Sequence, residues 1–253
     1  MRARVAAETG IELEVIDRET EATLAVIGCS PLLDPKGRGA ILFDIGGGST
    51  ELVRIERDPA APDAPPRIKA WMSIPLGVVT LAEHFGGKNV TRDLYAQMID
   101  EVARHVAPFA AEHGRDLRDM HMLGTSGTVT TLAGVFLNLS RYDRRRIDGI
   151  WMNDCDVTAT IQKLLGMSYE ARVNNSCISV ERADLVLAGC AILDAIRNAD
   201  VGGGEEGRVH DAVVPFGVMR CGMNAAPSSV MRPEVSRMPM PADSSPTTQA
   251  PIT

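Results

Sequence analysis

Aromatic side chains are scarce in this chain: they make up 4% of its 253 residues, although 45% of the residues are hydrophobic. A buried core must therefore consist mainly of aliphatic side chains, and the length suffices for one large or two small domains. The sequence also lacks an apolar run of the roughly 18 residues that a membrane span needs. Its first residues, Met1-Arg2-Ala3-Arg4, do not form an apolar secretory leader. We expect a cytoplasmic protein with no membrane partner.

An excess of positive charge is absent as well, because the net charge is −7. General affinity for nucleic acid needs a basic footprint, so we expect no nucleic-acid partner. The cysteines are five in number and form no C-x-x-C pair, which indicates reduced, buried or inert thiols. The dense basic run at residues 141–146 is either a solvated helix end or a binding surface for a polyanion.

A glycine-rich stretch at residues 43–53, FDIGGGSTELV, lies between two apolar runs. Two β-rich runs joined by glycines predict a hairpin with a wide turn. Consecutive glycines indicate a backbone that must reach positive φ or lie close to another group. Such a turn points successive N–H groups into one concavity, which binds anionic oxygens. The predicted phosphate-binding residues of this turn are Gly46, Gly47, Gly48 and Ser49.

Two acids, Asp44 and Glu51, flank this turn. Mg²⁺ usually takes one or two carboxylates together with substrate phosphates, so these acids are the predicted metal ligands. The alternative from the residues alone is a glycine-rich hairpin with two solvated acids, because short glycine motifs are often fortuitous.

A second glycine-containing turn follows an apolar stretch at residues 120–123 and precedes a predicted helix. Free N–H groups at a helix start favour an anion, although an ordinary Ser/Thr-capped helix start is the alternative. Two such turns on one lobe are more specific than either alone. The predicted phosphate-binding residues here are Gly124, Thr125, Ser126, Gly127 and Thr128.

Residues 43–53 resemble the second phosphate loop of the exopolyphosphatase / guanosine pentaphosphate phosphohydrolase family, within the actin–Hsp70–sugar kinase superfamily. Residues 73–81, 124–128 and 181–193 resemble further elements of that family. The resemblance implies an α/β, actin-like (ribonuclease H-like) lobe with a mixed sheet. It also implies Mg²⁺-dependent hydrolysis of phosphoanhydride bonds, in inorganic polyphosphate or in guanosine penta- or tetraphosphate.

Residues 15–22 resemble the family segment in which a Glu directly before Ala is the proposed base that activates water. By this resemblance Glu21 is the catalytic residue, whereas spacing alone favours a solvated acid. For Glu181 and Arg182 we favour a structural salt bridge over a role in the site. The family often has Arg where this chain has Thr80, which removes one cation from the phosphate side.

The resemblance departs at both ends of the chain. The family's first phosphate loop, Asp-x-Gly-Ser-Asn-Ser, does not occur in this sequence. We expect residues 1–38 to be a remnant of a first lobe, 39–224 to be the second lobe, and 225–253 to be a disordered tail. An exposed strand edge invites pairing, so a homodimer is one expected assembly. The alternative function is a phosphate-chain or nucleotide-binding protein without turnover.

The remaining expectations concern secondary structure. Capping and periodicity predict helices at 2–8 (ended by Gly10), from Asp17 to about 27 (with Gly28 past the end), from Thr91 onwards, at 156–165 (capped by Asp154 or Asp156) and at 181–193. Apolar alternation predicts strands at 11–16, 67–74, 147–152 and 209–214.

Overall fold

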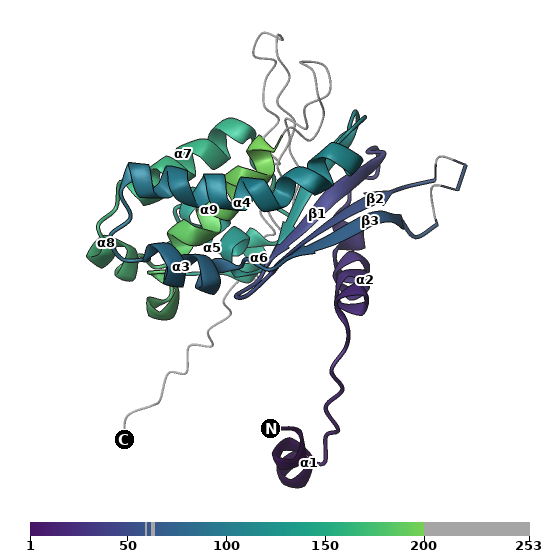
Figure 1. The fold of residues 1–253 in the computed structure, drawn as a ribbon, viewed down its shortest axis with the longest axis horizontal. Helices are drawn as coiled ribbons and strands as arrows, with labels where there is room; N and C mark the ends of the chain where they lie inside the picture. Colours follow the sequence, from purple (N-terminus) through teal and green to yellow (C-terminus); the bar gives the residue numbers. More distant parts are fainter. Residues whose placement is uncertain (59, 62–63, 200–253) are drawn as a thin grey trace, which may run out of the picture. The chain divides into compact units, whose positions relative to one another are not determined.

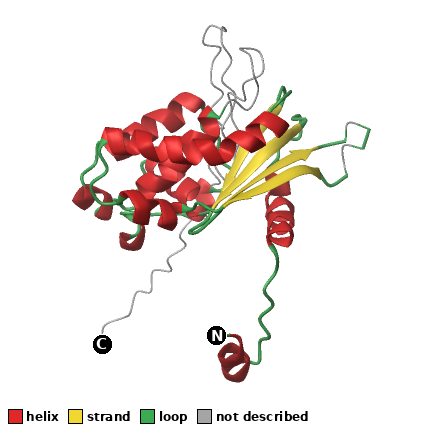
Figure 2. Ribbon diagram, in the orientation of Figure 1, coloured by secondary structure: helices red, strands yellow, loops and turns green. Residues whose placement is uncertain are grey.

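A four-stranded mixed sheet carries the site in this computed structural model, which describes residues 1–58, 60–61 and 64–199. The strands are β1 (Gly39–Ile45), β2 (Thr50–Glu56), β3 (Arg67–Ile74) and β4 (Met120–Thr125), in the order β3-β2-β1-β4. β2 is antiparallel to β1 and to β3, whereas β4 runs parallel to β1 (Figures 1 and 2). The predicted glycine-rich hairpin is confirmed, and the fold is the expected α/β class.

Helices lie before, between and after the strands along the chain, and Figure 2 draws them in red beside the yellow strands. They are α1 (Arg2–Thr9), α2 (Arg18–Cys29), α3 (Val78–Phe85), α4 (Arg92–His113), α5 (Gly127–Phe136), α6 (Arg144–Ile147), α7 (Asp154–Leu165), α8 (Tyr169–Val173) and α9 (Val186–Asn198), with 3-10 turns at Ser30–Leu32 and Val180–Arg182. The predicted caps at Asp17 and Thr91 are confirmed, since Asp17 accepts from Thr20 N at 2.8 Å and Thr91 from Leu94 N at 3.2 Å. Gly10 ends α1 in the left-handed conformation, as predicted.

Alternation along β1 divides the buried side chains into two layers. Ile41, Phe43 and Ile45 belong to the larger core under α4, α5 and α9. Ala40 and Leu42 belong to a smaller core, in which α2 covers the opposite face of the sheet. Figure 1 shows α2 and the α4–α9 pair on opposite sides of the strands. Any polar residue in register with Ala40 and Leu42 therefore faces α2.

The strand predicted at residues 11–16 is wrong: residues 11–17 form no regular element. Ile11, Leu13 and Val15 are 59%, 41% and 73% exposed. The alternation is present, but within the described residues no neighbouring strand pairs with this segment, and a strand needs such a partner for its backbone hydrogen bonds.

The strand predicted at 147–152 is also wrong. A helical turn, α6, ends at Ile147, and Gly149 takes a φ of 84° that breaks an extended run. Ile147 and Met152 are buried as isolated anchors rather than as a strand face.

Three helix boundaries differ from the prediction. The cap of α7 is Asn153, whose side chain accepts from Asp156 N at 2.8 Å, rather than Asp154 or Asp156. The last long helix begins at Val186 rather than at residue 181. Gly28 lies inside α2.

Cys29, Cys177 and Cys190 are buried free thiols and Cys155 is an exposed one, while Cys221 lies outside the described residues. In the described part of the chain, no helix combines the length and the apolar character that crossing a membrane requires. The strand predicted at 209–214 and the tail predicted at 225–253 lie outside the described residues.

Candidate active site

The glycine turn between β1 and β2 is held by the start of α3. The N–H groups of Val78 and Val79 donate to the carbonyls of Gly46 and Gly47 at 2.9 and 2.8 Å. A Cβ at Gly77 would collide with the backbone of both glycines, so the turn lies directly against Gly77. Positive φ among the described glycines occurs at residues 10, 86 and 149, so the left-handed explanation for the triple glycine is wrong. Close backbone approach, the other predicted reason, is the one observed.

This contact fixes the direction of the turn's N–H groups. In a trans peptide the C=O and the following N–H point in opposite directions. Because the Gly46 and Gly47 carbonyls point at α3, the N–H groups of Gly47 and Gly48 point away from it. Neither group, nor Ser49 N–H, donates to any residue that the structure describes. The turn therefore presents unpaired donors, as an anion-binding nest does.

Two acids are paired on the face of the sheet that α2 covers, and a third lies on α2 itself. Asp44 on β1 is the direct cross-strand partner of Glu51 on β2. Glu21, on the exposed side of α2, is close enough for its charge to act on Asp44. The structure thus pairs the two predicted metal ligands directly and places the predicted base, about thirty residues earlier in the sequence, within electrostatic reach of Asp44.

Asp44 titrates abnormally in this cluster. Burial is the main cause, followed by the neighbouring charge of Glu51 and, more weakly, that of Glu21, and together they raise the pKa of Asp44 to about 6. The nearby Ser126 hydroxyl acts in the opposite direction and lowers this pKa. Because Asp44 is partly desolvated and lies beside a second acid, a cation bound next to it would stabilise its charged form.

Glu51 is oriented by a chain of hydrogen bonds that sequence reasoning missed. Glu51 is only 4% exposed, and Ser73 Oγ on β3 donates to Glu51 Oε1 at 2.9 Å. Arg18 Nη1, in the first turn of α2, donates to Ser73 Oγ at 3.1 Å. This link also ties the helix that carries Glu21 to the strands that carry the other acids.

Asp44 and Glu51 are suitable ligands for Mg²⁺, but they are too few to complete its coordination by themselves. Across residues 1–58, 60–61 and 64–199 no group of three or more His, Cys, Asp or Glu side chains is arranged to hold a metal. Glu51 is buried and forms no ion pair with any described residue, and Asp44 beside it forms none either. A buried carboxylate without a cation is costly. Mg²⁺ commonly binds through one or two such carboxylates plus phosphate oxygens, which matches this pair.

The second predicted turn lies next to the first. Gly124 and Thr125 end β4, where Thr125 is the register partner of Asp44. Ser126 follows with φ 81° and ψ −172°, a conformation that side chains rarely adopt and that costs about 1–3 kcal/mol. Its hydroxyl donates to the carbonyl of Ile45 at 2.6 Å, which ties this turn to β1.

The start of α5 offers further donors. The first hydrogen bond of the helix runs from Thr130 N to Ser126 O at 3.2 Å, and no side chain caps the helix. The N–H groups of Gly127 and Thr128 therefore lack an acceptor within the helix. Both predicted phosphate turns thus end in unpaired N–H groups at the same edge of the sheet.

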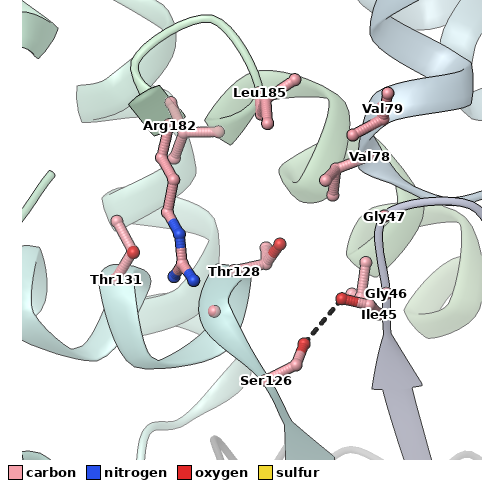
Figure 3. A pocket seen from close by; sticks show the side chains of 12 residues that line it. Ile45, Gly46, Gly47, Val78, Val79, Ser126, Thr128, Thr131, Arg182 and Leu185 are labelled. Atoms are coloured by element: carbon pink, nitrogen blue, oxygen red, sulfur yellow. Dashed lines mark hydrogen bonds between the residues drawn. The ribbon is translucent and has the colours of Figure 1, made fainter. Parts of the chain in front are cut away.

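A cavity of about 290 Å³ opens between the two turns. Its polar wall comes from the two turns and the start of α5, and its apolar wall from the starts of α3 and α9 (Figure 3). The lining residues are Ile45, Gly46, Gly47, Val78, Val79, Ser126, Gly127, Thr128, Thr131, Arg182, Leu185 and Val186.

Arg182 is the residue that sequence reasoning assigned wrongly. We predicted a structural salt bridge, but its guanidinium forms no ion pair or hydrogen bond within the described part of the chain. It lies over the start of α5, where a Cβ at Gly127 would collide with it, and it points into the cavity (Figure 3). A cation facing the positive end of a helix is unfavourable unless an anion lies between them.

Comparison with known proteins gives the family. The sequence profile of the Ppx/GppA phosphatase family matches residues 1–199. The chain belongs to this family. The chain is 26% identical over 199 residues to Exopolyphosphatase 2 of Mycobacterium tuberculosis, in strain H37Rv and equally in strain CDC 1551. The match covers 76% of this chain and 57% of the relative, so this chain spans little more than half of the relative's length.

Solved structures support the same fold. A crystal structure described as an exopolyphosphatase-like protein superposes with a TM-score of 0.74 at 24% identity, covering 86% of this chain and 68% of that one. The Ppx/GppA family member of Aquifex aeolicus gives a TM-score of 0.64 at 24% identity, over 79% and 61% of the two chains. An exopolyphosphatase from Cytophaga hutchinsonii gives 0.66 at 20% identity, over 80% and 62%. The actin-like α/β lobe of the Ppx/GppA fold is therefore confirmed.

Thr80, where this Ppx/GppA chain departs from the family pattern, has a structural role of its own. Thr80 Oγ1 accepts from Gly77 N at 2.8 Å, which helps to start α3 against the glycine turn. Thr80 does not line the cavity, whereas Arg182 does. In this chain the cation on the cavity wall comes from the turn before α9.

Proposed function

We propose that this protein hydrolyses phosphoanhydride bonds in a polyphosphorylated substrate, either inorganic polyphosphate or guanosine pentaphosphate. One observation carries the proposal: Asp44 and Glu51 are direct cross-strand partners beside a turn whose N–H groups are unpaired, and the charge of Glu21 acts on Asp44. Phosphoryl transfer depends mainly on positioning and on neutralising charge, which is what such an arrangement supplies.

Each group has a distinct task. The N–H groups of Gly47, Gly48 and Ser49 bind oxygens of the phosphate chain, and those of Gly127 and Thr128 bind a second phosphate. Arg182 adds a positive charge from the opposite wall of the cavity. Glu21 accepts a proton from the attacking water, a role that its exposure to solvent permits.

Magnesium completes the charge balance in this proposal. Asp44 and Glu51 would hold the ion, and when bound it neutralises phosphate charge. Ser73 holds one oxygen of Glu51, so the other oxygen is the one left for the metal. Metal-ligating side chains in general are oriented in this way, by hydrogen bonds from residues that do not touch the metal.

The test is phosphate release by the purified chain from both substrates, with and without Mg²⁺. We expect Mg²⁺-dependent release that Asp44→Asn reduces strongly and that raised Mg²⁺ partly restores. Asp100→Asn on α4 is the matched control, because it removes one exposed carboxylate far along the chain from the turn. Release that is equal with EDTA, or equal in Asp44→Asn and the wild type, would contradict the assignment.

A second candidate function is binding of a phosphate chain without turnover. The exposure of Glu21 favours it, since a general base works best where bulk water is excluded. Under this alternative both substrates bind in the presence of Mg²⁺ and no phosphate is released.

A further inference from the structure

Arg172 on α8 is a buried cation that no acid pairs with. It is 2% exposed, and no carboxylate of the described residues forms an ion pair with it. Its guanidinium instead donates four hydrogen bonds to main-chain carbonyls. A fully buried arginine is rare without an acidic partner, so here the carbonyl dipoles must balance its charge.

The four carbonyls belong to three separate segments. Nε donates to Ala183 O at 3.0 Å, Nη1 to Met167 O at 3.1 Å, and Nη2 to Gly87 O and Lys88 O at 3.2 and 2.7 Å. A guanidinium is planar and its donors point in fixed directions, so each bond fixes one segment relative to the others. Arg172 therefore holds the chain after α3, the loop before α8 and the turn before α9 in one arrangement.

Two of these segments belong to opposite walls of the cavity. α3 begins with Val78 beside the glycine turn and ends about 12 Å further on, two residues before Gly87. The turn before α9 carries Arg182, and the next residue, Ala183, accepts the bond from Arg172. The distance between the glycine turn and the Arg182 guanidinium therefore depends on α3 and on the contact that Arg172 closes.

The contact between these two segments is tight. A Cβ at Gly87 would collide with the backbone of Asp184, so the chain after α3 lies directly against the turn before α9. The Arg182 guanidinium lies just as closely over Gly127 at the start of α5. An outward shift of the turn before α9 would therefore carry Arg182 away from both phosphate-binding turns.

We propose that Arg172 is a positioning residue, which holds Arg182 at its working distance from the two phosphate-binding turns. This inference rests on the proposed function, because that function assigns Arg182 to the phosphate chain. Arg172 does not line the cavity, so it acts through Arg182 rather than on the substrate. A purely structural Arg172 would stabilise the fold without changing what Arg182 contributes to binding.

The experiment measures the contribution of Arg182 to anion binding with the contact intact and with it broken. Dissociation constants of inorganic pyrophosphate in Mg²⁺ are measured by calorimetry for pairs of proteins that differ only in Arg182→Gln. The pairs are made in the wild type, Arg172→Gln, Gly87→Ala and Arg197→Gln. Gly87→Ala disturbs the same contact without removing a buried charge, so it decides the outcome if Arg172→Gln does not fold.

Arg197→Gln is the matched control. Arg197 is also a buried arginine, since its side chain is 6% exposed, and it forms ion pairs with Asp154 and Asp194. It lies about 16 Å along α9 from the first residue of that helix, which lines the cavity. Its loss should lower the midpoint of urea denaturation, as loss of Arg172 should, but it should not move Arg182.

We expect Arg182→Gln to weaken pyrophosphate binding about tenfold in the wild type and in Arg197→Gln, as loss of a charged hydrogen bond does. In Arg172→Gln and in Gly87→Ala the further loss should be less than about twofold, because the two positions are coupled. A tenfold loss in all four backgrounds would overturn the inference. So would a loss that shrinks equally in Arg197→Gln, or no effect of Arg182→Gln in the wild type.

Failure of the two proposals can be told apart. If Arg182→Gln costs the same affinity in every background and phosphate is released from either substrate, the positioning role is wrong and the hydrolase stands. If the coupling is found but neither substrate is hydrolysed, the positioning role stands and hydrolysis is wrong. If pyrophosphate does not bind, both proposals are wrong.

Discussion

Adding one methyl group at Gly77 should displace the phosphate turn without unfolding the protein. A Cβ at this position would lie 2.5 Å from the carbonyl oxygen of Gly46 and closer still to the carbonyl of Gly47, against an ordinary contact that begins near 3.4 Å. The obstacle is backbone rather than a flexible side chain, so the turn must retreat by about 1 Å. The same movement stretches the bonds that Val78 N and Val79 N donate to those carbonyls.

The magnitude follows from this displacement. Misplacement by about 1 Å can lower the rate of a positioned reaction by about 10²-fold, whereas overpacking of this kind costs about 1–3 kcal/mol of stability. We therefore expect Gly77→Ala to remain folded and to lose about 10²-fold in kcat/KM for phosphate release. Urea denaturation checks the first statement and a phosphate-release assay the second.

Gly28→Ala is the control for Gly77→Ala. It adds the same methyl group on α2, where nothing lies within 4 Å of the new Cβ. It should keep its activity and gain a little stability, as Ala in a helix does relative to Gly. A folded Gly77→Ala protein with wild-type kcat/KM would refute the idea that α3 holds the turn in its working position.

Three further predictions concern other parts of the chain. Ser73→Ala should raise the Mg²⁺ concentration for half-maximal activity several-fold and cost about 1–3 kcal/mol of stability, because it leaves a buried Glu51 oxygen unpaired; Ser73→Thr should restore both, and an unchanged Mg²⁺ profile in Ser73→Ala would be inconsistent with this role. Gly127→Ala should displace the Arg182 guanidinium and weaken pyrophosphate binding several-fold. Combining it with Arg182→Gln should cause no further loss of affinity, whereas fully additive losses in the double variant would exclude the contact. Burial lowers the pKa of His121 to about 4, so below about pH 6.5 the unfolded chain binds more protons than the folded one. The free energy of unfolding should therefore fall by about 3 kcal/mol between pH 6.5 and 4. Urea denaturation of His121→Leu should show a flatter dependence of stability on pH, and a dependence identical to that of the wild type would refute this cause.

Local patterns predicted the elements that local interactions determine. The cap at Asp17, the hairpin around residues 46–49 and the helix starting after Thr91 were all predictable, because each depends on neighbours within a few residues. The segment at 11–16 shows the limit: its alternation is that of a strand, but its conformation depends on whether another strand lies beside it. A sequence pattern carries no information on that partner.

The site was predictable to a similar extent. Asp44, Glu51 and the turn between them lie within one hairpin, so their proximity follows from the sequence. The role of Arg182 could not be found in this way, because the turn before α9 reaches the start of α5 only in the folded chain. Its one signal in the sequence is an absence: no acid stands three or four residues away from Arg182 to pair with it on a helix. Ser73 was likewise placed beside Glu51 by the register between β2 and β3.

The central claim is that the acids beside the glycine turn carry out hydrolysis, and Glu21 tests it most directly. The measurement is kcat and KM for phosphate release from guanosine pentaphosphate by the wild type, Glu21→Gln and Glu19→Gln, across a Mg²⁺ titration. Glu19 is the matched control, since it is another exposed acid in the first turn of α2.

Removal of a general base typically lowers the rate by about 10²–10⁴-fold, and it acts on water rather than on the bound phosphate chain. We predict that Glu21→Gln loses kcat within this range at every Mg²⁺ concentration, with KM nearly unchanged, and that Glu19→Gln matches the wild type. A Glu21→Gln protein that releases phosphate as fast as Glu19→Gln would contradict the assignment of Glu21 as the base and, with it, the proposed mechanism.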